Sequence, residues 1–302
     1  MDRLAAMTVF VEAVDQGSLS AAGRTLGLPL ATVSRRLSEL EAHIGTRLLT
    51  RSTRQLALTD AGQAYLAACR RILDEVSDAE REAAGEYSAP RGELVITAPV
   101  VFGRMHVLPL VTDFLRQYSD VDVRLVLGDR ALNLLDEHVD LAVRIGALPD
   151  SSLIAVRVGE VRRVVCASPT YFNQRGLPIH PDDLIGHDGV IFDGLPSPLS
   201  WVFRVDRAEV AEIMVPIRSR LTVNTANAAI DAAIAGVGVT RVLSYQISEA
   251  ERIGALQVVL QAYEPPPWPV HLVYARQGRL PVKLRAFIDA VVPALRERLL
   301  NL

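Results

Sequence analysis

One stretch constrains the fold of this chain more than any other: residues 10–59, and within it residues 30–44. Apolar side chains recur there at i, i+4, i+7 and i+11, namely Val33, Leu37, Leu40 and Ile44. This spacing forms one stripe of a helix, which we expect to be buried. At the start of the helix, the positions outside this stripe hold small and hydroxylated residues, and arginines follow: Ala31, Thr32, Ser34, Arg35 and Arg36. Small side chains let a helix approach another surface closely, where arginine supplies charge and hydrogen-bond donors.

Two further helices are expected before this one. The first has an apolar stripe made of Leu4, Met7, Phe10, Val11 and Val14. Gly17 ends it, Ser18 can cap a second helix, and Gly27 closes that helix. Pro29 stands where the third helix starts, a position that tolerates its missing N–H. Two helices, a short glycine-containing turn and a third helix have the spacing of a helix-turn-helix motif.

An arginine-bearing hairpin, or wing, is expected at residues 48–58, after Gly45. In a helix-turn-helix protein the third helix enters the DNA major groove. We therefore expect Ala31 and Thr32 to contact base edges and Arg35 to bind guanine through two hydrogen bonds. Ser34, Arg51 and Arg54 are expected to contact phosphates. Two roles are open for Arg36, a solvated surface charge or a DNA contact.

The segments FVEAVDQGSLSAAGRTLGL, ATVSRRLSELEAHIGTRLLTRSTR and LALTDAG occur in this order, without gaps between their counterparts. They resemble the N-terminal domain of LysR-type transcriptional regulators. The resemblance implies a winged helix-turn-helix that binds double-stranded operator DNA. One departure is visible: the family often opens the third helix with Ser-Gln, whereas this chain has Pro29 and Leu30. A contact from that glutamine is absent here, so the sequence preference is expected to differ.

Net charge alone does not indicate a nucleic-acid partner, because the formal charge is -3. The basic residues are local: Arg35, Arg36, Arg47, Arg51 and Arg54 cluster on the expected DNA face. Only two cysteines occur, Cys69 and Cys166, which fits reduced thiols rather than a disulfide framework. Charged residues near the N-terminus argue against a signal peptide, and no apolar run is long enough to span a membrane. A cytoplasmic location and no membrane partner are expected.

A long helix is expected from residue 60, with Thr59 as its cap. Its apolar positions are spaced 4, 3, 4 and 3 residues apart: Tyr65, Cys69, Ile72, Val76 and Ala79. This heptad seam predicts a helix that pairs with a second copy and so makes a homodimer. The alternative is a helix packed on its own domain. Residues 85–92, which include Pro90, predict a hinge.

The remainder of the chain alternates strand and helix patterns, which predicts a parallel sheet covered by helices. The segments LPLVTDFLRQYSDVDVRLVLGD, EHVDLAVRIG and AAIAGVGVTRV resemble the LysR effector domain. The resemblance implies an α/β fold of two subdomains, like type 2 periplasmic binding proteins. The expected domains are 1–59 for DNA binding, 60–88 for the linker helix and hinge, and 89–302 for effector binding. Subdomain I covers about 93–163 and 268–302, and subdomain II about 164–267.

An effector site is expected between the subdomains, where two helices begin. Free N–H groups at a helix start favour an anion or a carbonyl. The candidate residues are Pro99, Val100, Val101, Phe102, Asp129, Arg144, Thr225 and Ala226. Val100 to Phe102 would make the mouth of this site apolar. Arg144 would face the ligand or, equally, pair with an acid such as Asp129 or Asp193.

No motif in the sequence indicates an enzyme. The six histidines are scattered, without the spacing of a metal site, and no phosphate-binding loop or GxSxG sequence follows a strand. An enzyme or a free-standing small-molecule-binding protein on the same fold is the alternative function. We expect no cofactor, a small-molecule effector of unknown identity, and RNA polymerase as a further partner. The resemblance also implies a homotetramer built from dimers.

Overall fold

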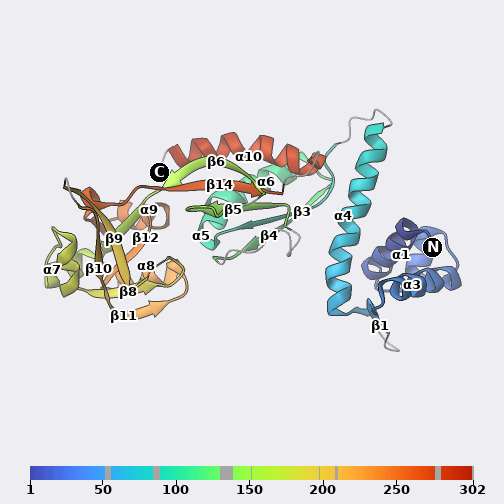
Figure 1. Ribbon diagram of the computed structural model, residues 1–302, viewed down its shortest axis with the longest axis horizontal. Coiled ribbons are helices and arrows are strands. Elements are labelled where there is room, and N and C mark those ends of the chain that lie inside the picture. Colours follow the sequence, from blue (N-terminus) through green and yellow to red (C-terminus); the bar gives the residue numbers. More distant parts are fainter. Residues whose placement is uncertain are drawn as a thin grey trace. The chain divides into compact units, whose positions relative to one another are not determined.

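The computed structural model describes residues 1–51, 56–83, 89–129, 139–150, 152–196, 198–207, 210–275 and 280–300. The chain divides into two compact units, Met1–Gly92 and Glu93–Leu302. Figure 1 shows the course of the chain through both, and each is described by itself. In the described part of the chain, no helix combines the length and the apolar character needed to cross a membrane.

The first unit is a winged helix-turn-helix followed by a long helix. Its elements are α1 (Arg3–Asp15), α2 (Leu19–Leu26), α3 (Leu30–Ile44), the antiparallel strands β1 (Leu49–Arg51) and β2 (Leu56–Leu58), and α4 (Asp60–Ala83). The expected end signals are confirmed. The N–H of Ala21 donates to Ser18 Oγ, Gly27 has a left-handed backbone, and Thr59 Oγ1 accepts from the N–H of Gly62. These short-range contacts fix where each helix begins and ends.

The long helix α4 begins inside the core of its own unit. Cys69 is fully buried among side chains of α1 and α3, and the ring of Tyr65 lies 5.9 Å from that of Phe10. Arg70 of α4 also pairs with Asp15 of α1. Cys69 is therefore not available to a seam between two chains in this structure, whereas Tyr65 is half-buried. A stripe with 3,4 spacing packs equally well on a neighbouring helix of the same chain. Farther along, Ile72 and Val76 are half-buried and Ala79 is exposed.

The second unit contains two five-stranded sheets. The first has the order β4-β3-β5-β14-β6, with strands Val121–Leu127, Gly92–Ala98, Leu141–Ile145, Trp268–Tyr274 and Ile154–Val161. Strand β3 is parallel to β5, but β14 is antiparallel to both β5 and β6. The expected parallel sheet is thus mixed, because β14 enters it after the chain has passed through the second sheet. Its helices are α5 (Val100–Phe102), the π-helix η1 (Gly103–Val107), α6 (Leu108–Gln117) and α10 (Val282–Leu300). Helix α10 runs along β6 and β14 (Figure 1). The sequence also predicts a short helix at residues 132–137, which lie outside the described residues.

The second sheet has the order β11-β8-β12-β7-β13. Its strands are Arg218–Val223, Asp188–Phe192, Val239–Leu243, Arg163–Ala167 and Gln257–Val259. The helices of this subdomain are α7 (Pro169–Arg175), η2 (Pro181–Gly186), α8 (Ala226–Ile234), α9 (Ser244–Arg252) and η3 (Gln261–Tyr263). A hairpin of β9 (Ser200–Arg207) and β10 (Val210–Pro216) forms a separate two-stranded sheet. The side chains of Trp201 and Phe203 on this hairpin pack in one buried cluster with Val165 and Ile191 of the five-stranded sheet.

The chain crosses between the two sheets twice, once between β6 and β7 and once between β13 and β14. Arg162 lies on the first crossing and Glu264 on the second. Nη1 of Arg162 lies 3.0 Å from both carboxylate oxygens of Glu264. The two crossings are therefore joined by an ion pair.

Candidate nucleic-acid interface and effector site

The face of α3 opposite its buried stripe is open to solvent. Val33, Leu37 and Leu40 are fully buried, while Ala31 is exposed and Thr32 and Ser34 are half-buried. The sequence pattern thus predicted correctly which side of α3 packs inward. The outward side is small near the N-terminus of the helix, where a recognition helix must come close to base edges.

Arg35 lies in the middle of this outward face, and its side chain is 65% exposed. Its Nη1 lies 2.8 Å from Oε1 of Glu39, one turn farther along the helix. An exposed pair of this kind contributes little to stability and can exchange for another acceptor. Glu39 therefore holds the guanidinium on the outward face while leaving it available to a base or phosphate. Arg36, by comparison, is half-buried.

The wing is attached to α3 by a residue that sequence reasoning missed. Oε1 of Glu41 accepts hydrogen bonds from the N–H groups of Leu48 and Leu49, at 2.8 and 3.1 Å. Thr59 Oγ1 donates to the carbonyl of Arg47 at 2.8 Å. These bonds fix the strand that leads to Arg51, whose backbone belongs to β1. Arg54 lies outside the described residues.

The N-terminus of α3 differs from the polar start that the family often has. Pro29 is the N-cap and has no side-chain cap hydrogen bond, and Leu30 is 51% exposed. An exposed leucine here offers a DNA surface apolar contact, such as with a thymine methyl group, but no hydrogen bond.

Each of the two helix starts expected to bind an effector has one N–H group paired within the chain. After the N-cap Pro99, the N–H of Val100 donates to Oδ1 of Asp129 at 3.1 Å, and Thr225 Oγ1 accepts from the N–H of Ala228. Arg144 is half-buried, and burial lowers the pKa of its guanidinium; it is not a free cation. One N–H group at each of the two helix starts therefore has a partner within the chain.

The expectation that Val101 and Phe102 line an apolar mouth is corrected by the structure. Phe102 has an exposed fraction of 0% and Val101 of 5%, so only Val100 of the three is exposed. Both buried residues belong to one cluster that includes Ala226 of the second subdomain. The apolar residues at this helix start contribute to the contact between the subdomains.

Three aromatic rings form the centre of that contact. The rings of Phe102 and Tyr245 are 5.3 Å apart and perpendicular, and His106 lies 4.8 Å from Phe102 and 5.5 Å from Tyr245. Burial, with a smaller effect from the positive charge of Arg298, lowers the pKa of His106 to about 4. Its Nε2 has no hydrogen-bond partner. The imidazole is therefore neutral at pH 7, and no spacing in the sequence indicated this role.

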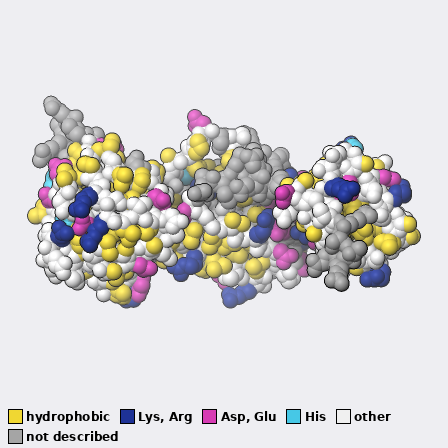
Figure 2. Space-filling model, turned by 90° about the horizontal axis from the view of Figure 1, so that it is seen from below, with side chains coloured by type: hydrophobic (Ala, Val, Ile, Leu, Met, Phe, Trp, Pro, Cys, Tyr) yellow, Lys and Arg dark blue, Asp and Glu magenta, His cyan; other side chains and the backbone are white. Residues whose placement is uncertain are grey.

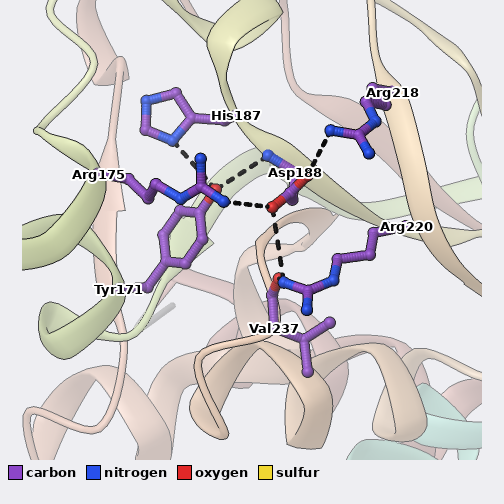
Figure 3. Close-up of polar contacts among 7 residues, drawn as sticks. All are labelled: Tyr171, Arg175, His187, Asp188, Arg218, Arg220 and Val237. Atoms are coloured by element: carbon purple, nitrogen blue, oxygen red, sulfur yellow. Dashed lines mark hydrogen bonds and ion pairs between the residues drawn. The ribbon is translucent and has the colours of Figure 1, made fainter.

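A charged cluster on the second subdomain was also missed from the sequence. Asp188, at the start of β8, is buried, and its carboxylate lies 3.0 Å from Arg175, 3.2 Å from Arg218 and 3.5 Å from Arg220. Its N–H donates to the hydroxyl of Tyr171, which also lies 3.3 Å from His187 Nδ1 (Figure 3). Figure 2 shows basic side chains gathered around an acidic one on this part of the surface. The arginines balance the negative charge of a buried carboxylate, and this structural role is enough to explain the cluster.

Two regions of the chain match known families. Residues 4–63 match "Bacterial regulatory helix-turn-helix protein, lysR family", and residues 88–296 match "LysR substrate binding domain". An HTH-type transcriptional regulator of Xanthomonas campestris pv. campestris (strain 8004) is 35% identical over 95% of this chain and 84% of its own. The HTH-type transcriptional activator AaeR of Escherichia coli (strain K12) is 33% identical over 96% and 93%.

Solved structures agree with these matches. CrgA, a LysR-type transcriptional regulator from Neisseria meningitidis, has a TM-score of 0.62 and 29% identity over 96% of this chain and 98% of its own. The full-length Vibrio cholerae virulence activator AphB has a TM-score of 0.59 and 28% identity over the same shares. These relatives are transcriptional regulators and not enzymes, which agrees with the motifs. The expected fold and function class are confirmed, and the chain belongs to the LysR family of transcriptional regulators.

Proposed function

We propose that the exposed face of α3 reads operator DNA in the major groove, with Arg35 as its main base contact. Ala31 and Thr32 approach base edges, and Ser34 and the wing arginines Arg51 and Arg54 hold phosphates. The observation that carries this assignment is the combination of a fully buried stripe on α3 with an exposed arginine on its opposite side. Phosphate contacts set the register, and the base contact supplies sequence preference.

We further propose that two chains pair through the second half of α4, from Ile72 to Ala79, and that dimers associate into tetramers. A dimer places two copies of α3 about one helical turn apart, roughly 34 Å, so the operator is an inverted repeat. The regulator acts in the cytoplasm, where RNA polymerase is a further partner, and it needs no cofactor. A small effector bound in the second unit changes the spacing of the DNA-binding domains.

The experiment is a gel-shift series with single-base operator variants and the Arg35→Ala protein. Loss of a bidentate guanine contact costs about 1–3 kcal/mol and relaxes preference at one base pair. Arg116→Ala is the matched control, because Arg116 is an exposed arginine paired with Asp113 on α6, outside the DNA-binding unit. If Arg35→Ala binds all operator variants as the unchanged protein does, α3 does not dock through this face.

A further inference from the structure

Two arginines lie on the same face of the second sheet, beneath the β9–β10 hairpin. Arg241 of β12 stands opposite Val165 of β7, and Leu243 stands opposite Arg163. Directly opposed residues share a sheet face, and so do residues two apart on one strand, so both guanidinium groups point to the same side. Arg241 is only 6% exposed. The two positive charges are close enough to repel, and this repulsion adds to burial in lowering the pKa of Arg241 to about 10.

Several donors of these arginines have no acceptor among the described residues. Nε and Nη1 of Arg241 and Nε of Arg163 are buried without a hydrogen-bond partner. The hydrogen bonds that these arginines do make are long: Nη2 of Arg241 lies 3.5 Å from the carbonyl oxygen of Pro196, and Nη2 of Arg163 lies 3.3 Å from that of Pro266. Buried donors of a native protein are normally paired, so three orphaned N–H groups at one place require an explanation. In the Asp188 cluster, by contrast, the arginines have an acceptor, because they share one carboxylate.

Each of the two arginines lies over a tryptophan ring. Cζ of Arg241 is 5.3 Å from the ring centre of Trp201, and Cζ of Arg163 is 4.5 Å from that of Trp268. Ring faces compensate part of the charge of a buried cation, and they also hold the guanidinium planes in fixed positions. They supply no acceptor for the free N–H groups, and no other described residue does, so these donors are free for a further group.

The charge balance indicates what that group is. Among the described residues, neither guanidinium has a carboxylate within ion-pair distance. Burial lowers the pKa of Arg163, and the negative charge of Glu212 on β10 partly opposes this shift. Among the described residues, these two cations and the one anion leave one positive charge. A single negative charge completes this balance, and a carboxylate offers two acceptor oxygens to guanidinium donors.

We propose that Arg241 and Arg163 bind the carboxylate of a small organic monoanion. Arg163 begins β7 and Trp268 begins β14, the two strands that follow the crossings between the sheets. A ligand at this position therefore touches both connections between the subdomains. If, as in the function proposed above, an effector regulates DNA binding, this anion is that effector; the binding itself does not depend on that function.

The test uses the full chain without DNA and measures tryptophan emission. The chain contains only two tryptophans, and each packs against one of the two arginines. Sodium acetate and sodium benzoate are titrated as probes, sodium phosphate serves as the dianion, and ionic strength is constant. We expect a saturable emission change with the carboxylates, and at least tenfold weaker binding by Arg241→Met. Arg218→Met is the matched control and keeps the response, because its charge belongs to the Asp188 cluster.

The unfolding temperature is a second measurement. If Arg241 only stabilised the fold, Arg241→Met would unfold at a lower temperature than the unchanged protein. Without carboxylate, Arg241→Met should unfold at the same temperature as the unchanged protein or a higher one, since it removes a buried unpaired charge. Carboxylate should raise the unfolding temperature of the unchanged protein only. Arg163→Met, at a half-buried position, repeats the test if Arg241→Met does not fold.

Three results would overturn the proposal. The first is no saturable response of the unchanged protein to either carboxylate. The second is a response of Arg241→Met and Arg163→Met that equals the response of the unchanged protein. The third is tighter binding of phosphate than of acetate, which contradicts the single-charge balance. Operator footprinting separates this proposal from the regulatory one. Carboxylate binding without any change in the footprint leaves the anion site standing and refutes its role as effector site.

Discussion

At the scale of single residues, His106 links the stability of the second unit to pH. Its ring is buried between Phe102 and Tyr245, and its pKa is lowered to about 4 from the ordinary 6.5. Between these two values the unfolded chain binds a proton that the folded chain does not. Stability contributed by the neutral ring is therefore complete above pH 6.5 and is lost as pH falls toward 4.

Urea unfolding at several pH values tests this linkage in His106→Phe, which keeps an aromatic ring but cannot be protonated. The unchanged protein should lose roughly 2 kcal/mol more than the variant between pH 6.5 and 5, at about 1.4 kcal/mol per pH unit. Carboxylates titrate in both proteins, so the difference between the two curves isolates the imidazole. Parallel curves would mean that His106 is protonated in the folded protein as easily as in the unfolded chain.

Residue roles that depend on near neighbours in sequence were predictable, and those that depend on distant strands were not. The caps at Ser18, Thr59 and Thr225 follow from one side chain and the backbone three residues later. The burial of Phe102 depends on Tyr245, which is remote in sequence. The unpaired donors of Arg241 likewise follow from the register of β12 against β7, which no local pattern encodes.

At the scale of elements, α4 has two different halves. Its first half is part of the core of the DNA-binding unit through Leu66 and Cys69. Burial raises the pKa of the Cys69 thiol to about 11, so the thiol stays protonated at pH 7. The second half carries the half-buried Ile72 and Val76, which remain available for a second chain. The heptad spacing runs through both halves, which is why the sequence could not separate them.

Val76→Asp tests the pairing of the second half. A carboxylate buried without a partner strongly disfavours an interface, so sedimentation velocity should show a smaller species with weaker operator binding. Ala64→Asp is the matched control, since it adds the same charge at an exposed position of α4 outside the seam. An unchanged sedimentation coefficient for Val76→Asp at micromolar concentration would exclude pairing through this half of the helix.

At the scale of the whole molecule, the second unit combines a contact between its subdomains with two connections between its five-stranded sheets. The contact consists of buried aromatic side chains, and the connections are joined by Arg162 and Glu264. Burial raises the pKa of Glu264, although the charge of Arg162 opposes this shift. The general division into two α/β subdomains was implied by the resemblance to the LysR effector domain. The direction of β14 was not, because it is set by the order in which the chain crosses between sheets.

Phe102→Ala decides whether this contact is a structural core or the wall of an effector site. Truncating a fully buried phenylalanine costs about 3–5 kcal/mol, because the lost contacts leave a cavity. We expect denaturant unfolding to show that loss in the second unit, whereas the DNA-binding unit of the same protein unfolds as before. Val100→Ala, at the neighbouring exposed position, should change stability by less than about 0.5 kcal/mol. If Phe102→Ala instead keeps its full stability and loses only an effector response, Phe102 contacts ligand, and the aromatic contact opens when the effector binds.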